Sequence, residues 1–233
     1  MDHSVAFIYA HPDDESFLSA GLIRELADEH VNPVLLLATK GDAGNKNGYV
    51  SHLSHDQLAS VREKEMEHAA EILGISVIEH LGFPDGKLTQ VDENLFVGAI
   101  VNFINKYQPK VIFTFPEDGC NFHPDHMTIS KMTTTAVLSG KCPTVQKLYY
   151  CMSNTLAADG HHPTITIDVE KHWPMKVRAL QAHESQILAI KRFFGDLQSF
   201  PENRRYESFV LKWNKGLLWT SIEEKTIFDD LTR

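Results

Sequence analysis

The chain has 233 residues, of which 42% are hydrophobic and 23% are charged. This composition is typical of a folded globular protein and excludes a collagen-like, low-complexity or disordered chain. The net charge of −9, from 22 Lys and Arg against 31 Asp and Glu, argues against nucleic acid or an anionic membrane as a partner.

Short apolar runs alternate with amphipathic stretches over residues 4–152. The runs are continuous and rich in β-branched and aromatic residues, as buried parallel strands are; they cover residues 5–10, 34–38, 77–81, 111–115 and 148–152. Between them, apolar residues recur at helical spacing, for example Leu18, Leu22 and Leu26. The alternation predicts an α/β fold of the Rossmann-like, doubly wound type, with a mostly parallel sheet and helices on both faces.

The last third of the chain is less regular. It predicts a strand at Thr164–Asp168, a helix at about 172–190 and an edge strand at Glu207–Lys212. We expect one domain over residues 1–233, made of a core (1–152) and a C-terminal extension (153–233).

The first predicted strand leads directly into Ala10-His11-Pro12-Asp13-Asp14-Glu15. Proline suits the first turn of a helix, so a strand here feeds a helix N-terminus. The carboxyl ends of parallel strands border the ligand crevice, where binding groups are expected. The helix dipole alone explains the acidic residues, but it does not explain His11.

The fourth predicted strand is followed by His123-Pro124-Asp125-His126. Alone, this His-x-x-His pair is as compatible with a solvated helix surface as with a site. Strands one and four flank the switch point of a doubly wound sheet, so the two motifs face each other. Two histidines with a carboxylate suit catalytic zinc and also non-haem iron. We expect a metal-dependent hydrolase site, with the individual roles open.

Together the two motifs resemble the PIG-L/LmbE family of zinc-dependent N-deacetylases, which act on N-acetylglucosaminyl compounds such as bacillithiol, mycothiol and GPI-anchor precursors. Four further segments match the family in order: Thr39–Gly44, Arg62 with Glu65, Gly82–Gly86 and Lys176–Gln186. The resemblance implies a deacetylase that releases acetate from an N-acetylated amino sugar. A metal-dependent esterase or phosphoesterase, and a non-catalytic metal- or sugar-binding protein, are the alternatives.

By the same resemblance, His11, Asp14 and His126 bind one Zn²⁺ per chain and Asp13 is the general base. A spare acid beside three ligands favours catalysis over binding alone, because binding needs no base.

The resemblance also implies that His123 faces the substrate carbonyl and that Asp125 orients its ring. Some members of the family have a tyrosine two residues before the first histidine of this motif; here that position is Asn121, whose amide can donate a hydrogen bond.

Four residues are candidates for contacting substrate: Asn121, Arg62, Asp42 and His183. Structural alternatives accompany three of them. Arg62 can pair with a helix carboxylate, Asp42 suits a Gly-flanked turn, and His183 fits the edge of the core. Asp85 before Gly86 is a turn signal that also matches the family.

The cysteines and the N-terminus indicate a cytoplasmic protein. Cys120, Cys142 and Cys151 form no C-x-x-C pair, so neither a disulfide framework nor a thiolate zinc site is expected. Residues 1–4 lack the basic segment of a signal peptide. From relatives of the family, a homo-oligomer (trimer or hexamer) is expected.

Overall fold

The computed structural model describes residues 5–45 and 50–232, so residues 1–4, used above for localisation, lie outside the described part. Its strands form a single sheet in the order β3-β2-β1-β4-β5-β7-β6, with β8 paired to β7. The strands are β1 Val5–Tyr9, β2 Pro33–Leu37, β3 Val77–His80, β4 Val111–Thr114, β5 Lys147–Cys151, β6 Ile165–Asp168, β7 Tyr206–Asn214 and β8 Leu217–Leu218.

The first five strands form the parallel, Rossmann-like part of the sheet. β1 pairs with β2 on one side and with β4 on the other, so the strand order reverses between β1 and β4. All residues of β1, β2, β4 and β5 are buried, because helices cover both faces of the sheet. The predicted fold class is confirmed.

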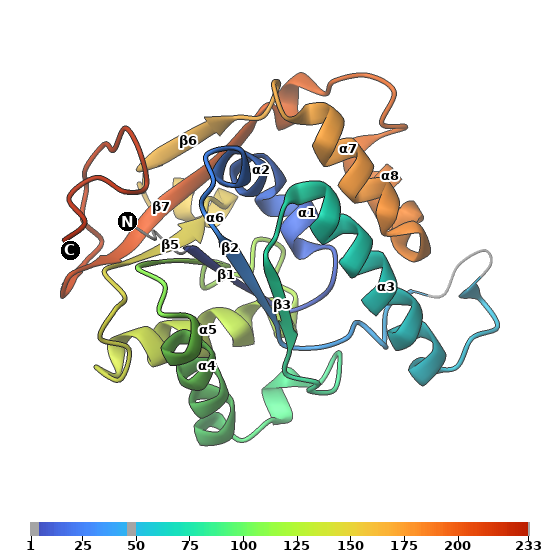
Figure 1. Ribbon diagram of the computed structural model, residues 1–233, viewed down its shortest axis with the longest axis horizontal. Helices are drawn as coiled ribbons and strands as arrows, with labels where there is room; N and C mark the ends of the chain where they lie inside the picture. Colours follow the sequence, from blue (N-terminus) through green and yellow to red (C-terminus); the bar gives the residue numbers. More distant parts are fainter. Residues whose placement is uncertain (1–4, 46–49, 233) are drawn as a thin grey trace.

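Two groups of helices cover the sheet (Figure 1). α4 packs on α5 on one face, whereas α7 contacts both α2 and α3 on the other. The helices are α1 Asp14–Leu18, α2 Ala20–Asp28, α3 His55–Leu73, α4 Glu93–Tyr107, α5 Pro124–Leu138, α6 Asn154–Ala158, α7 Trp173–Ala182 and α8 Ile187–Phe194. Short 3-10 turns lie at Leu88–Gln90, Glu184–Gln186 and Glu202–Arg204.

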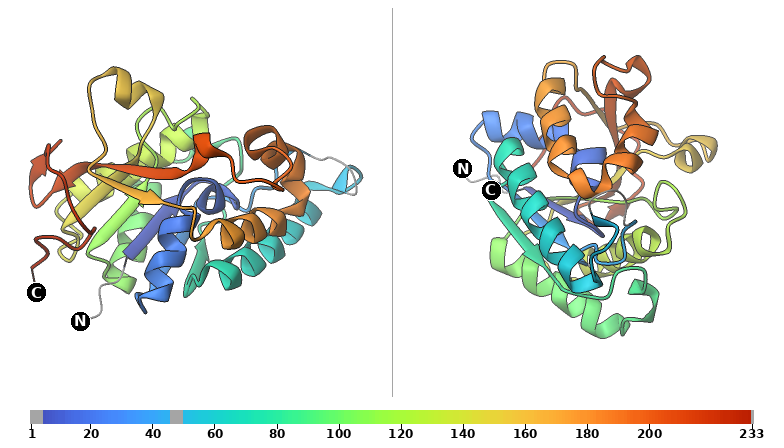
Figure 2. Two further views of the ribbon diagram at one scale, coloured as in Figure 1. Left: turned by 90° about the horizontal axis from the view of Figure 1, so that it is seen from above. Right: turned by 90° about the vertical axis from the view of Figure 1, so that its right-hand side faces the viewer.

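The C-terminal extension differs from prediction in two places. β7 lies between β5 and β6 and is antiparallel to both, so the expected edge strand at Glu207–Lys212 is an interior strand. The expected helix at 172–190 is divided into α7 and α8, because the backbone of His183 leaves helical geometry (ψ 55°). α7 packs along α3 (Figure 2), and α8 follows α7 in the chain.

Within the described residues, no helix combines the length and apolar character needed to cross a bilayer. The cysteines Cys120, Cys142 and Cys151 are all free thiols, as expected.

Candidate metal and catalytic site

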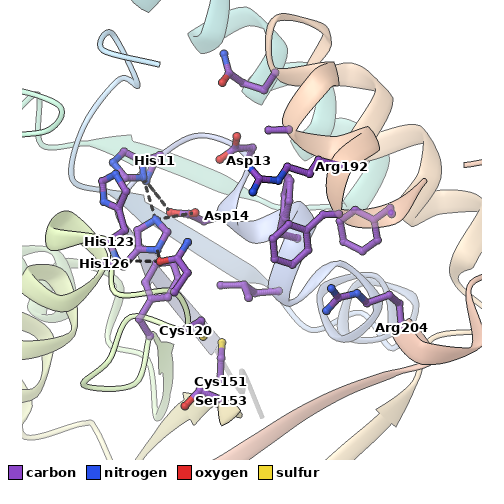
Figure 3. A pocket seen from close by; sticks show the side chains of 18 of the residues that line it. His11, Asp13, Asp14, Cys120, His123, His126, Cys151, Ser153, Arg192 and Arg204 are labelled. Atoms are coloured by element: carbon purple, nitrogen blue, oxygen red, sulfur yellow. Dashed lines mark hydrogen bonds and ion pairs between the residues drawn. The ribbon is translucent and has the colours of Figure 1, made fainter. Parts of the chain in front are cut away.

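The neighbouring positions of β1 and β4 bring the two histidine motifs together. His11 follows β1, and His126 lies in the first turn of α5 after β4. Their ring nitrogens, Nδ1 of His11 and Nε2 of His126, are 3.2 Å apart although 115 positions separate the residues. Both side chains line a cavity of about 1050 Å³ (Figure 3).

Three side chains that line this cavity, His11, Asp14 and His126, bring four nitrogen and oxygen atoms close together. Asp14 Oδ1 lies 3.4 Å from His126 Nε2, and Asp14 Oδ2 lies 3.7 Å from His11 Nδ1. Two atoms that bind zinc at ~2.0–2.1 Å with a tetrahedral angle are about 3.3 Å apart. His11, Asp14 and His126 are therefore close enough to share one metal ion. Among the described residues, His11 also forms a candidate metal group with His123 and His126, and another with Asp85 and Asp125.

Hydrogen bonds and ion pairs orient each of the two histidine rings. Nε2 of His11 lies 3.1 Å from Asp85 Oδ1 and 3.3 Å from Asp125 Oδ2. Nδ1 of His126 lies 3.1 Å from both the Gly119 carbonyl and Asn121 Oδ1. Each ring thus donates from one nitrogen and presents the other toward Asp14. Metal-binding histidines are commonly held by such partners.

The electrostatic environment favours a cation at this position. Burial lowers the pKa of His11, but its bonds to Asp125 and Asp85 outweigh burial and raise that pKa to about 10. Burial, together with the nearby His11 and His123, lowers the pKa of His126 to about 3. The surrounding carboxylates therefore attract positive charge, while His126 has the neutral ring that binds a metal.

Asp13 lies beside this set in an unusual backbone conformation. Its φ is 114°, in a region that L-residues rarely adopt, and its N–H donates to Glu15 Oε2 at 3.0 Å. Its own Oδ2 is 3.1 Å from Arg62 Nη2. Burial and the neighbouring Asp14 raise the pKa of Asp13 to about 6, although Arg62 opposes the shift. A carboxyl group with such a pKa is suited to proton transfer near neutral pH.

Arg62 is buried behind Asp13 and is engaged by the protein. Its guanidinium donates to the carbonyls of Pro12 and Gly41 as well as facing Asp13. It lines the cavity, but its observed partners are the Asp13 loop and the Gly41 loop. These contacts tie the loop that carries Asp13 to the loop that carries Gly41.

The remaining predicted residues fall into two groups. His123 and Asn121 line the cavity, whereas Asp42 and His183 do not. A ring nitrogen of His123 lies within 4.8 Å of those of His11 and His126. Asp42 contacts His55 through its backbone carbonyl, and His183 is fully buried against Glu15.

Asp125 contacts both histidine motifs, through different groups. Its carboxylate accepts hydrogen bonds from the backbone N–H groups of Gly86 and Leu88 and faces His11. Only its backbone N–H contacts His123, at Nδ1. The carboxylate therefore orients His11 and not the ring of His123, because the loop after β3 places its N–H donors there.

Asp85, for which the sequence left a turn and a site role open, contacts His11, and Glu15, which the sequence did not single out, contacts the backbone of Asp13. Asp85 joins His11 to the backbone N–H of Ala43, and these bonds lower its pKa to about 2 despite burial. Glu15 joins Asp13 to His183. In the sequence, the match of Gly82–Gly86 to the family indicates a role for Asp85. The acidic run after Pro12 is the only feature that indicates one for Glu15.

Comparison with known proteins gives a consistent set of relatives. The chain is 28% identical over 217 residues to a probable N-acetyl-alpha-D-glucosaminyl L-malate deacetylase 2 of Bacillus cereus, covering 91% of this chain and 94% of that protein. It is 32% identical over 193 residues to the diacetylchitobiose deacetylase of Thermococcus kodakarensis, covering 78% and 69%.

The N,N'-diacetylchitobiose deacetylase of Pyrococcus horikoshii shares the fold, with a TM-score of 0.69 and 22% identity over 90% of this chain and 83% of that one. A family model described as "PIG-L: GlcNAc-PI de-N-acetylase" matches residues 6–137, more than half of the chain. The chain therefore belongs to the PIG-L family of de-N-acetylases.

Proposed function

We propose that this protein is a zinc-dependent deacetylase that removes the N-acetyl group from a small molecule containing N-acetylglucosamine. The single observation that carries the proposal is the convergence of His11, Asp14 and His126 at ligand spacing, with Asp13 beside them as an acid outside the ligand set. The substrates in the names of the relatives, a glucosaminyl malate and a diacetylated chitobiose, support the acetamido sugar.

When bound by His11, Asp14 and His126, zinc would activate water and polarise the acetyl carbonyl. Asp13 takes a proton from the attacking water while Arg62 holds its carboxylate in place. The water oxygen adds to the carbonyl carbon, the C–N bond breaks, and the products are acetate and a free amine. Asp13, once protonated, supplies the proton that the leaving amine needs.

His123 and Asn121 are placed to stabilise the charge that develops on the carbonyl oxygen. Both line the cavity and lie close to His126. The Asn121 oxygen already accepts from His126 Nδ1 and from the backbone N–H of His123, which leaves its NH₂ group as a donor. Donors fixed in advance at such a position are typically a large part of catalysis by acyl-transfer enzymes.

An acetate-release assay tests this function. The purified protein, loaded with Zn²⁺, is offered N-acetylglucosamine, its methyl glycoside, N,N'-diacetylchitobiose and a phosphodiester. We expect acetate and a free amine from the acetamido sugars only, and about one zinc per chain by elemental analysis. Phosphate-ester cleavage without acetate release would contradict the proposal. The expected cytoplasmic location and the trimer or hexamer stay predictions, for cell fractionation and light scattering respectively.

A further inference from the structure

The cavity extends well beyond the metal-binding residues. Its volume of about 1050 Å³ is at the upper end of the ~300–1,000 Å³ that holds a drug-sized ligand. The histidines occupy one end, and α8 together with the turn Glu202–Arg204 forms the other (Figure 3). A single acetamido sugar at the metal would leave this second end for a substituent on the sugar.

Two of the four Lys and Arg side chains that line the cavity are neutralised by the protein. Arg62 pairs with Asp13, and Lys176 pairs with Glu207 at 2.7 Å. Both of these cations are buried, so their charges are already balanced and are not offered to a ligand.

The other two, Arg192 and Arg204, are unbalanced. Neither guanidinium has an acidic partner among the residues that the structure describes, and Nε of Arg204 is buried without a hydrogen-bond acceptor there. Arg204 stacks on the ring of Phe193 at 4.7 Å and near that of Phe194 at 6.0 Å. This stacking holds the planar guanidinium in position, as in sites that bind carboxylate or phosphate.

The charge of these two arginines contrasts with that of the whole protein, which is acidic, with a net charge of −9. Two unpaired arginines on one wall of a cavity, facing the histidines across it (Figure 3), create a local positive region where the rest of the chain is negative. Such a region attracts an anionic group and binds it by charge-assisted hydrogen bonds.

We propose that Arg192 and Arg204 form an anion subsite that binds a carboxylate or phosphate on the substituent of the sugar, on the wall of the cavity opposite the histidines. This inference rests on the proposed deacetylase function. It assigns specificity to the C-terminal extension: the core supplies the reacting groups, and α8 with the turn before β7 selects substrates by charge.

The test compares three substrates that share the acetamido sugar: the neutral methyl glycoside, a glycoside of a hydroxy acid, and N-acetylglucosamine 1-phosphate. We expect the wild-type protein to have a higher kcat/KM for at least one anionic substrate than for the neutral one, and a preference that declines as salt is added. The carboxylate and phosphate arms identify which anion the subsite accepts.

Arg192→Gln and Arg204→Gln should each lower the ratio of anionic to neutral kcat/KM by about tenfold or more, mainly through KM. Arg178→Gln is the matched control, because Arg178 is exposed on α7 outside this cavity; its ratio should equal that of the wild type. Equal ratios in all four proteins, or no preference for an anion in the wild type, would overturn the subsite. Failure to release acetate from any of the three substrates would instead contradict the deacetylase function.

Discussion

Glu15 Oε1 and His183 Nε2 are 2.9 Å apart, and neither side chain is exposed to solvent. Burial opposes both charges, but their mutual attraction outweighs it, lowering the pKa of Glu15 and raising that of His183. The second oxygen of Glu15 accepts the N–H of Asp13. A residue of the C-terminal extension thereby supports the backbone of the proposed general base, through one intervening carboxylate.

We predict that His183→Ala lowers the free energy of unfolding by about 3–5 kcal/mol, because it leaves Glu15 buried and without its partner. In the folded fraction, kcat should decrease while KM changes little, because His183 does not line the cavity. Chemical denaturation and steady-state kinetics measure the two effects.

His183→Gln and His162→Ala are the comparisons for this prediction. Glutamine can donate to Glu15 and should restore part of both the stability and kcat, whereas His162 is exposed and its removal should change neither. An unchanged denaturation midpoint in His183→Ala would show that the pair adds no stability, and an unchanged kcat would show that it does not support Asp13.

Asp125→Asn should weaken zinc binding by about 10–100-fold, the usual effect of removing a carboxylate that orients a metal-binding histidine. The asparagine keeps an oxygen for one of the two backbone N–H groups of the loop after β3, so the fold should persist. Competition with a chelator measures the zinc affinity. Asp92→Asn is the control, since Asp92 is exposed, caps α4 and does not line the cavity, and asparagine caps equally well. Unchanged affinity in Asp125→Asn would show that Asp125 has no part in the site.

Gly119→Ala should reduce both zinc content and stability. Gly119 has φ +61°, where a side chain costs about 1–2 kcal/mol, and an added Cβ would lie 2.6 Å from Cβ of His126. Gly98→Ala is a matched control with open space around the new methyl group; there we expect a stabilisation of about 0.5–1 kcal/mol, because Gly98 lies within α4. Thermal unfolding and metal analysis measure the two effects. A wild-type melting temperature and zinc content in Gly119→Ala would contradict this account of the loop.

The parallel core could be predicted from sequence because its strands are continuous apolar runs between amphipathic helices. The convergence of His11 and His126 followed from the same reasoning, since β1 and β4 meet where the strand order reverses. In this part of the chain, the residue pattern of each strand is consistent with the strand order of the whole sheet.

The hydrogen-bond partners of these residues could not be predicted from the sequence, because they lie far away along the chain. The carboxylate of Asp125 faces His11 because of two N–H groups in a loop 37 and 39 positions away, and nothing in its own motif indicates that partner. The helix ends at His183, whose side chain contacts Glu15, 168 positions away. β7 is an interior strand because β6 pairs with it on the side away from β5. The residue pattern of β7 alone does not indicate this second neighbour.

The most direct test of the central claim is the zinc content of Asp13→Asn, measured on the same sample as its acetate release. If His11, Asp14 and His126 hold the metal and Asp13 moves the proton, the variant keeps about one zinc per chain and loses about 10²–10⁴-fold in kcat. Loss of the zinc would make Asp13 a ligand, and retained turnover would remove it from the reaction; either result would contradict the assignment of roles.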